Sequence, residues 1–296
     1  MRLLGLGLAA TAGGLAYAHF EASWFAVREA RAQVLKAGEK PIRILHLSDI
    51  HLVPNDRRKI EWLRSLAALE PDLVVNTGDN ISSPLSVRPL VEALEPVSHV
   101  PGVFVFGSND YFAPKLKNPA KYLVGGTGTD NGGDWDRTPN LPYEAIRTAF
   151  EANGWRDLNN ATTDLIVNGQ RLSFVGVDDP HIRRDDLSSG KVDTTGDLSI
   201  GVVHAPYLRV LDDWSAQGCE LILAGHTHGG QLRVPGIGAL VTNCDLDRAR
   251  ARGLSKYGVS GGHQSWLNVS AGCGTSPFTP VRFACRPEAT LLTLTE

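Results

Sequence analysis

AGHTHGGQLRVPG, residues 224–236, follows the apolar residues 221–223 and places two histidines one position apart. An apolar run that meets a glycine-rich turn predicts a buried strand. Two imidazoles directly beyond such a strand are unusual for a segment that only fills a core. We therefore expect His226 and His228 to act together with side chains from other segments.

Three apolar runs in the first half of the chain also end in polar residues. They are PIRILHLSDIHL (41–52), DLVVNTGDN (72–80) and GVFVFGSND (102–110), preceded by a short charged segment. Between them, residues 57–69 and 87–97 have helical spacing, and Pro71 stops the first of these helices. This β-α-β-α-β order predicts an α/β fold with a largely parallel central sheet.

The second half of the chain continues the pattern. Residues 115–142 predict a long surface loop, and residues 143–155 predict a helix that ends at Asn153-Gly154. A hairpin is expected to turn at Asn168-Gly169. Further strands are expected in LSIGVVHAP (198–206), in CELILAGHTHGG (219–230) and within residues 266–295. With no linker or repeat between them, residues 21–296 are predicted to form one domain.

Composition excludes some classes of protein. Hydrophobic residues make up 42% of the 296 residues and charged residues 21%, as in folded globular proteins. A net charge of -3 without a run of Lys or Arg gives no sign of a nucleic-acid surface, and nothing in the sequence predicts a protein partner. Four cysteines without a C-x-x-C pair are expected to be buried free thiols: Cys219, Cys244, Cys273 and Cys285.

The first twenty residues, MRLLGLGLAATAGGLAYAHF, form a hydrophobic N-terminal segment. Its apolar stretch is slightly shorter than the ~20 residues of a spanning helix. A membrane anchor or interfacial helix is the favoured interpretation, with sidedness open. A cleaved signal peptide, with Ala16-Tyr17-Ala18 before the cut, and a helix packed on the domain are the alternatives. Membrane association is thus expected, and a secreted or a cytoplasmic location is the alternative.

Five predicted strands end in side chains that can bind a metal. In open α/β sheets, ligands bind beyond the carboxyl ends of strands, so these segments can converge. An extended Asp-x-His or His-x-His would point both side chains the same way. Imidazoles with carboxylates suit Zn, Mn or Fe, and one carboxylate can bridge two cations. Single residues have simpler explanations: His46 and His99 as structural histidines and Asp79 as a turn residue. The strand-end residues are Asp49, His51, Asp79, Asn80, Asn109, Asp110, His204, His226 and His228.

The ordered blocks LSDIHL, NTGDN, GSND, VVHAP and AGHTHGGQ resemble the calcineurin-like metallophosphoesterases, over residues 41–275. The similarity is greatest to a bacterial branch with an N-terminal hydrophobic segment, which includes cell-envelope phosphoesterases and a lipid A precursor pyrophosphatase. It implies a two-sheet α/β sandwich flanked by helices, with a dinuclear metal site at the C-terminal ends of the strands.

By position, the resemblance implies that Asp49, His51 and His228 hold one divalent ion, His204 and His226 hold a second, and Asp79 bridges them. The third block departs from the family's Gly-Asn-His-Asp, because this chain has Gly107-Ser108-Asn109-Asp110. An ungapped match puts Ser108 in the amide-ligand position. We favour Asn109 as the ligand through a one-residue shift. Either alignment lacks the histidine that assists the leaving group.

Two cations ~3.5–4 Å apart would lower the pKa of a bridging water, and the resulting hydroxide would attack phosphorus. The missing histidine predicts either a good leaving group, such as a diphosphate, or another proton donor. His181 in VDDPHIRRDD is the candidate donor, and a surface-loop histidine is the simpler interpretation. Arg183 and Arg184 could bind a second phosphate or lie in a solvated loop.

The sequence therefore predicts a phosphodiesterase or pyrophosphatase with two Mn, Fe or Zn ions. A phosphorylated small molecule or a lipid-linked phosphate is the expected substrate. The alternative is a metal-binding scaffold that has lost the chemistry, which the altered GSND block favours. A structural zinc site is disfavoured, because such sites usually use cysteine.

Overall fold

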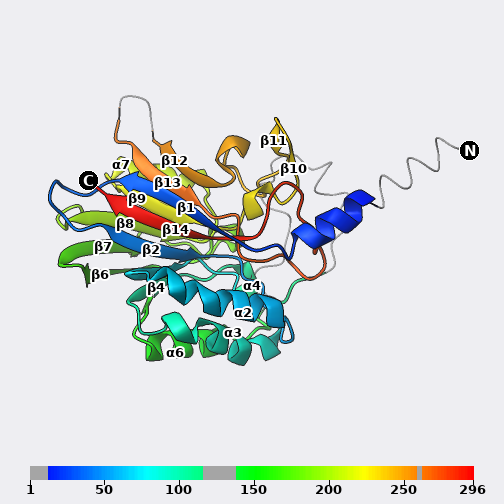
Figure 1. Cartoon of the computed structure of the whole chain (residues 1–296). Coiled ribbons are helices and arrows are strands. Elements are labelled where there is room, and N and C mark those ends of the chain that lie inside the picture. The colour runs from blue at the N-terminus through cyan, green and yellow to red at the C-terminus, as the bar shows by residue number, and fades with distance from the viewer. Residues whose placement is uncertain (1–12, 116–137, 259–261) are drawn as a thin grey trace, which may run out of the picture.

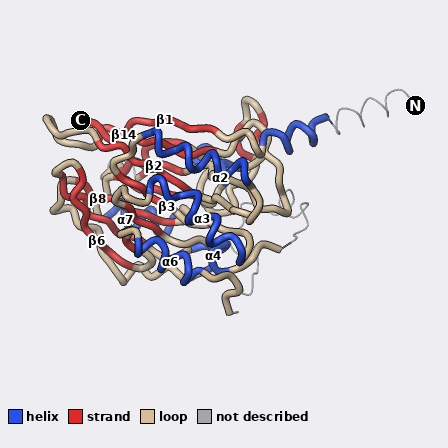
Figure 2. Tube along the Cα trace, turned by 60° about the horizontal axis from the view of Figure 1, so that its bottom comes forward, coloured by secondary structure: helices blue, strands red, loops and turns tan. Residues whose placement is uncertain are grey.

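The computed structural model describes residues 13–115, 138–258 and 262–296, and within them two six-stranded sheets face each other (Figures 1 and 2). The first sheet contains β1 (Ala26–Gln33), β2 (Ile42–Leu47), β3 (Leu73–Asn76), β4 (Gly102–Phe104), β5 (Arg156–Asp157) and β14 (Glu288–Thr295). The second contains β6 (Ala161–Val167), β7 (Gln170–Gly176), β8 (Leu198–Val203), β9 (Leu221–Ala224), β12 (Gly253–Tyr257) and β13 (Ser265–Val269). A small hairpin, β10 (Arg233–Val234) with β11 (Gly238–Ala239), stands apart from both.

The strand orders are β1-β14-β2-β3-β4-β5 and β12-β13-β9-β8-β7-β6. The neighbours β2, β3, β4 and β5 pair in parallel, as do β7, β8, β9 and β13. The predicted β-α-β-α-β unit is therefore confirmed, and so is the two-sheet α/β sandwich. The parallel strands β2 and β3 of the first sheet and β8 and β9 of the second each end in a loop that carries polar residues.

Helices cover the outer faces of the sandwich. The helices α2 (Arg57–Ser65), α3 (Val87–Leu94) and α6 (Tyr143–Ala152) lie side by side below the first sheet, and α7 (Leu208–Ala216) packs on the second (Figures 1 and 2). The one-turn helix α4 (Ser108–Tyr111) follows β4. Short 3-10 turns lie at Leu66–Leu69, Pro84–Ser86, Glu95–Val97, Pro180–Ile182, His228–Gly230 and Arg248–Arg250.

Alternation along the strands builds three apolar layers. On β2, Leu45 packs toward the helices of the first sheet, whereas its neighbour Ile44 packs between the two sheets. On β9, Leu223 joins Ile44 in the central layer, and Ile222 packs toward α7. Strands buried on both faces become nearly continuous apolar runs, which is why the sequence predicted them clearly.

Several strands were missed, namely β1 and the short strands β5, β10, β11 and β12. The segment before residue 41, predicted only as a charged stretch, contains β1, which pairs in parallel with β14. Its sequence AVREARAQ alternates between half-buried and exposed positions, because β1 is the edge strand of the first sheet. A charged edge strand carries little hydrophobic signal, since only one side of it is paired.

Local turn signals are confirmed where glycine and asparagine predicted them. In the β6–β7 hairpin, Val167 pairs with Gln170, and the two intervening residues, Asn168 and Gly169, have φ of 51° and 87°. Two consecutive positive φ angles are what a tight hairpin turn requires. The α6 helix ends with Asn153, and the following Gly154 has φ of 84°.

Several predictions fall partly outside the described residues. These include residues 1–12 of the hydrophobic N-terminal segment and residues 116–137 of the long loop. Residues 13–21 are helical, and this helix extends from one end of the sandwich (Figure 1). Within the described ranges, no helix has the length and apolarity needed to cross a bilayer. The four cysteines are buried and unbridged, as expected.

Candidate metal centre

The loops after β2, β3, β8 and β9 carry the candidate ligands to one place. The expected extended geometry is wrong, however, because Asp49 and His51 have φ of 48° and 46°, and His226 and His228 have φ of 68° and 50°. Asp79 also lies in this left-handed region, with φ of 56°. Positive φ in residues other than glycine is uncommon and concentrates at functional sites. The side chains converge because the loops turn sharply.

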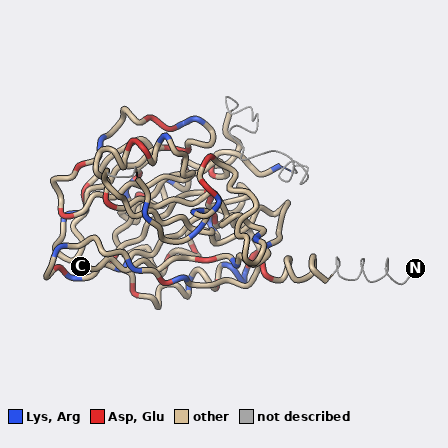
Figure 3. Tube along the Cα trace, turned by 90° about the horizontal axis from the view of Figure 1, so that it is seen from above, with Lys and Arg blue, Asp and Glu red and all other residues tan. Residues whose placement is uncertain are grey.

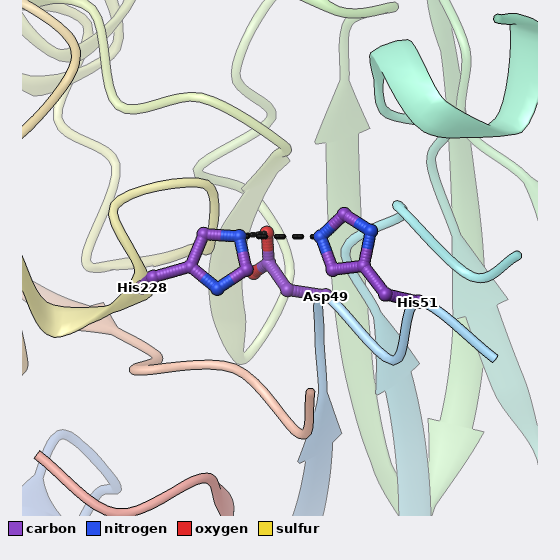
Figure 4. Close-up of side chains that lie close together, drawn as sticks. All are labelled: Asp49, His51 and His228. Atoms are coloured by element: carbon purple, nitrogen blue, oxygen red, sulfur yellow. Dashed lines mark hydrogen bonds and ion pairs between the residues drawn. The ribbon is translucent and has the colours of Figure 1, made fainter. Parts of the chain in front are cut away.

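Three of these residues form a first group of ligand atoms (Figure 4). The Nε2 atoms of His51 and His228 lie 3.2 Å apart, and His228 Nε2 lies 3.5 Å from Asp49 Oδ1. The remaining neighbour is Asp79, whose Oδ2 is 3.5 Å from His51 Nε2. Such spacings leave room for one cation between the donor atoms.

A second group combines Asp49 and Asp79 with His204. His204 Nδ1 donates to the carbonyl oxygen of Thr77 at 2.7 Å, and Nε2 therefore faces the site, 3.6 Å from Asp79 Oδ1. His204 Nε2 and Asp49 Oδ1 are buried without a hydrogen-bond partner among the described residues. Buried polar atoms normally have a partner, so these two atoms have the character of metal ligands.

The charges around the two groups favour a cation. Burial would lower the pKa of His204, but the carboxylates of Asp79, Asp179 and Asp49 raise it to about 9. Burial would raise the pKa of Asp79, but His204, His51 and Asn109 lower it to about 2. Without metal, His204 therefore carries a proton that compensates the clustered carboxylates, and a divalent ion can take over that role.

The other imidazoles are kept neutral. Burial lowers the pKa of His51 to about 4, and burial followed by the charge of Arg282 holds the pKa of His228 well below 6.5. Burial likewise lowers the pKa of His226, with His181 adding to the effect. Neutral imidazoles have a lone pair to offer, which is the form that binds metals.

Two glycines are required by the close packing of the centre. A Cβ atom on Gly107 would overlap Asp79 Oδ1 and lie 2.6 Å from His204 Cε1. A Cβ atom on Gly225 would overlap Ser48 Oγ and lie 2.7 Å from Asp49 Oδ2. The glycines of the GSND and GHTH blocks therefore allow the backbone to pass directly beneath the ligands.

Asn109 lies beside Asp79. Its Nδ2 donates to Asp79 Oδ2 at 2.7 Å and its backbone N–H donates to Asp79 Oδ1 at 2.7 Å. Ser108 Oγ accepts from the same amide nitrogen at 3.4 Å. In this arrangement the amide of Asn109 is a donor to a carboxylate, and its use as a metal ligand stays a prediction.

His226 belongs to neither group of ligand atoms. Its Nε2 lies 3.1 Å from the carbonyl oxygen of Asn243, while its ring packs edge-on against His204 at 5.2 Å. On its other side the ring centroid of His181 is 4.5 Å away. His181 is only 6% exposed, and Nδ1 lies 3.0 Å from the hydroxyl of Tyr207. The simpler interpretation of His181 as a surface-loop residue is therefore wrong.

Two buried acidic residues support the loops of the centre, and only Asp110 was named from the sequence, as a strand-end residue that could bind a metal. Asp110 is fully buried and accepts from the backbone N–H groups of Asp79, Asn80 and Gly107 at 2.8–2.9 Å. Asp179 is also fully buried, with one oxygen accepting from the His181 N–H. Both residues stand within motifs quoted from the sequence, Asp110 in GSND and Asp179 in VDDPH. Nothing in those motifs indicated that the carboxylates are buried.

Arg282 is a third supporting residue, and no motif in the sequence pointed to it. It is fully buried, donates to the carbonyl oxygens of His228 and Gly274, and lies 3.0 Å from His228 Nδ1. Arginine has no acceptor, so Nδ1 of His228 must accept this hydrogen bond. Arg282 therefore fixes both the loop and the ring of His228.

A cavity of about 350 Å³ opens onto the centre. Its polar lining includes His51, Asp79, Asn109, His181 and His226. The remainder of its wall is largely apolar and comes from Phe112, Leu232, Leu240, Val241, Phe278 and Val281. A ligand in this cavity would contact the candidate metal ligands and an apolar wall at once.

An α/β sandwich with carboxylates and neutral imidazoles gathered beyond its strands has the architecture of a metal-dependent hydrolase. The sequence profile described as calcineurin-like phosphoesterase matches residues 42–230, which include every predicted ligand. The chain therefore belongs to the calcineurin-like phosphoesterase family, and it is a hydrolase that acts on phosphoester bonds. The predicted family and fold class are confirmed.

Relatives match along most of the chain. Phosphodiesterase YaeI of Escherichia coli (strain K12) is 26% identical, over 96% of this chain and 94% of its own length. The uncharacterized metallophosphoesterase YkuE of Bacillus subtilis (strain 168) is also 26% identical, over 98% of this chain and 93% of its own. Among solved structures, TT1561 of Thermus thermophilus is similar with a TM-score of 0.40 and 13% identity, covering 79% of this chain and 90% of that one.

Proposed function

We propose that the protein is a phosphodiesterase that uses two divalent cations, Mn, Fe or Zn, bound between the loops after β2, β3, β8 and β9. The observation that carries this proposal is the position of Asp79. One of its oxygens lies 3.5 Å from His51 Nε2, and the other lies 3.6 Å from His204 Nε2. A carboxylate that faces two imidazoles with separate oxygens is suited to bridge two cations.

In this proposal Asp49, His51 and His228 hold the first cation, His204 and His226 hold the second, and Asp79 contacts both. Bound divalent cations supply an acidified water as nucleophile and neutralise charge on the phosphoryl oxygens. Asn109 completes the ligand set if its amide turns to present the oxygen. The name of the relative YaeI supports a diester as the substrate.

His181 is proposed to give a proton to the leaving group. It lines the same cavity as the ligands, its ring packs on His226, and its Nδ1 is held by Tyr207. The Asp179 carboxylate accepts from the His181 backbone N–H and so fixes the turn that presents the ring. A positioned donor of this kind contributes typically ~10²–10⁴-fold.

The substrate is proposed to carry a large apolar group, as a lipid-linked phosphate does. Phe112, Val241 and Phe278 line the cavity that also contains the proposed ligands. An apolar substituent can pack against these side chains while the phosphate lies among His51, Asp79 and His226. A small polar phosphoester would leave the apolar wall in contact with water, which is unfavourable.

The test is a metal and activity measurement on the purified chain. Metal content per chain and hydrolysis of bis-p-nitrophenyl phosphate are compared for the wild type, Asp79→Asn and the surface control Asp164→Asn. We expect two ions per chain and Mn-dependent turnover in the wild type and the control. Asp79→Asn should lose bound metal and more than about a hundredfold in turnover, since even outer-shell changes cost roughly 10–100-fold.

Other results would contradict the proposal. A single ion per chain would exclude the dinuclear arrangement. Bound metal without hydrolysis of a monoester, a diester or a lipid diphosphate would favour the non-catalytic scaffold. Faster turnover of the diphosphate than of the diester would make the protein a pyrophosphatase.

A further inference from the structure

The helix of residues 13–21 is hydrogen-bonded to residues 282–285, which directly follow Val281 of the cavity wall. The backbone N–H of Arg282 donates to the carbonyl oxygen of Ala18 at 2.8 Å. The carboxylate of Glu21, only 1% exposed, accepts from the N–H groups of Ala284 and Cys285 at 3.0 and 2.5 Å. The helix thus has a defined face on the protein and a second face directed to solvent.

The solvent face of this helix is aromatic. Tyr17 and Phe20 lie on the helix and Trp24 follows its end, and their exposed fractions are 45, 53 and 43%. Phe20 and Trp24 are in contact, with ring centroids 5.8 Å apart. Residues 13–21 contain no Lys or Arg (Figure 3), and their single acidic side chain, Glu21, is buried.

The aromatic face continues onto the body of the protein. Tyr17 packs edge-on against Phe283, with centroids 5.7 Å apart, and Phe283 pairs with Leu232 through a β-bridge. Leu232 leads into the β10–β11 hairpin, whose turn exposes 75% of Ile237. We call this surface the apolar rim: Leu15, Tyr17, Phe20, Trp24, Leu232, Val234, Ile237, Phe278 and Phe283.

The rim borders the cavity of the metal centre. Leu232 and Phe278 belong to the rim and also line that cavity. Among the described residues, twelve large hydrophobic side chains are exposed, and nine of them are in the rim. Exposed apolar surface concentrated in one place marks an interaction site rather than ordinary scatter.

Several basic side chains lie next to the apolar rim. Lys115 lines the cavity and is exposed, and Arg233 lies within the β10–β11 hairpin. The guanidinium of Arg286 lies 4.1 Å from the ring centroid of Trp24. Arg248 donates to the carbonyl oxygen of Leu240, another cavity residue. Residues 231–286 contain seven Lys and Arg against two Asp, although Arg282 is buried and Arg250 pairs with Asp247. The basic side chains beside the rim, Lys115, Arg233, Arg248 and Arg286, are complementary to anionic headgroups.

We propose that the apolar rim docks the protein on the surface of an anionic lipid bilayer, so that the cavity of the metal centre opens toward the lipid. Aromatic and aliphatic side chains next to Arg and Lys, on a helix without charge on its outer face, are typical of interfacial binding. The first twelve residues, MRLLGLGLAATA, contain one charge and precede this helix directly. A protein partner on the same surface would cover the cavity edge formed by Leu232 and Phe278. A bilayer would instead present substrate there, and this last point rests on the proposed function.

The test uses the full chain and vesicles of equimolar phosphatidylglycerol and phosphatidylethanolamine, compared with pure phosphatidylcholine. Cosedimentation is measured for the wild type, Phe20→Asp, Ile237→Asp and Ile166→Asp. Ile166 is a matched control, since it is 66% exposed on β6 and outside the rim. We expect the two rim variants to weaken binding to the anionic vesicles by about tenfold each, and the control to bind as the wild type does. Phosphatidylcholine vesicles should bind more weakly, since they lack net charge.

Two further measurements separate docking from hydrolysis. Asp79→Asn should bind vesicles normally, so a failure of the proposed chemistry would leave the docking result intact. The rim variants should hydrolyse a water-soluble diester at the wild-type rate, which shows that they fold. Equal losses in Ile166→Asp and the rim variants would overturn the proposal. The proposal would also be overturned if the wild-type chain bound neither type of vesicle and formed a dimer that the rim variants disrupt.

Discussion

His51 Nε2 and His228 Nε2 lie 3.2 Å apart, although 177 positions separate these residues in the sequence. Their rings are nearly parallel, with centroids 5.0 Å apart and an interplanar angle of 22°. Because His228 Nδ1 accepts from Arg282, the neutral His228 ring carries its proton on Nε2 and can donate it to Nε2 of His51. A cation bound between the two nitrogen atoms would replace that proton. This relationship is the basis of the first prediction.

Replacing His228 by alanine should weaken metal binding. We expect His228→Ala to lower the affinity for Mn²⁺ by more than about a hundredfold, because outer-shell changes alone typically cost roughly 10–100-fold. Calorimetric titration of metal-free protein measures this directly. The control is His99→Ala, an exposed histidine outside the centre. Unchanged affinity in His228→Ala would remove this residue from the ligand set.

Replacing His181 should affect protonation of the leaving group rather than metal binding. For His181→Gln we expect a loss of ~10²–10⁴-fold in kcat for a diester with an alkoxide leaving group. The loss should be much smaller for a p-nitrophenolate leaving group, which needs no proton. Tyr207→Phe should show a weaker form of the same dependence, because Tyr207 holds His181 Nδ1. A loss of bound metal in His181→Gln would instead make this residue a ligand.

Asp110 should stabilise the loops beneath the centre. Its carboxylate accepts three backbone N–H groups, from Asp79, Asn80 and Gly107, and asparagine cannot accept all of them without placing an NH₂ group against a donor. We expect Asp110→Asn to lower the free energy of unfolding by about 2–3 kcal/mol. Urea denaturation checks this value, with the exposed Asp186→Asn as the control. Equal stability of the two variants would contradict the assigned role.

Stability should fall in mild acid through His46. Burial lowers the pKa of this ring to about 3, and its nitrogens lie 3.0 Å from Thr77 Oγ1 and 2.9 Å from Asn268 Nδ2. Below the unfolded-state pKa of about 6.5, the unfolded chain binds a proton that the folded chain excludes. The folded state is therefore favoured fully above pH ~6.5 and loses stability as the pH falls toward 3.

The contribution of His46 to the pH dependence of stability can be measured with the variant His46→Gln. At pH 5 the His46 contribution should be about 2 kcal/mol less favourable than at pH 8, from the difference between the two pKa values. His46→Gln lacks this titration and should show a correspondingly smaller loss between the two pH values. Urea denaturation of metal-free protein at both pH values gives the comparison. The same pH dependence in the wild type and His46→Gln would exclude His46 as its source.

Much of the fold could be predicted from local patterns. The buried strands β2, β3, β8 and β9 are apolar runs with polar ends, and the β6–β7 turn is specified by Asn168-Gly169. These features depend on residues within one turn or one strand. The edge strand β1 was missed because its stability comes from pairing with β14, which lies about 260 positions away in the sequence.

The sequence by itself determined the family, the strand ends that bear candidate ligands and the residue types available for a metal. Tertiary structure alone decided that Asp79 faces both His51 and His204, that His181 is buried against His226, and that Arg282 contacts His228. Local sequence sets backbone conformation and the chemistry of each side chain. Distances between side chains from separate strands depend on how the two sheets pack. Short-range patterns in the sequence do not specify that packing.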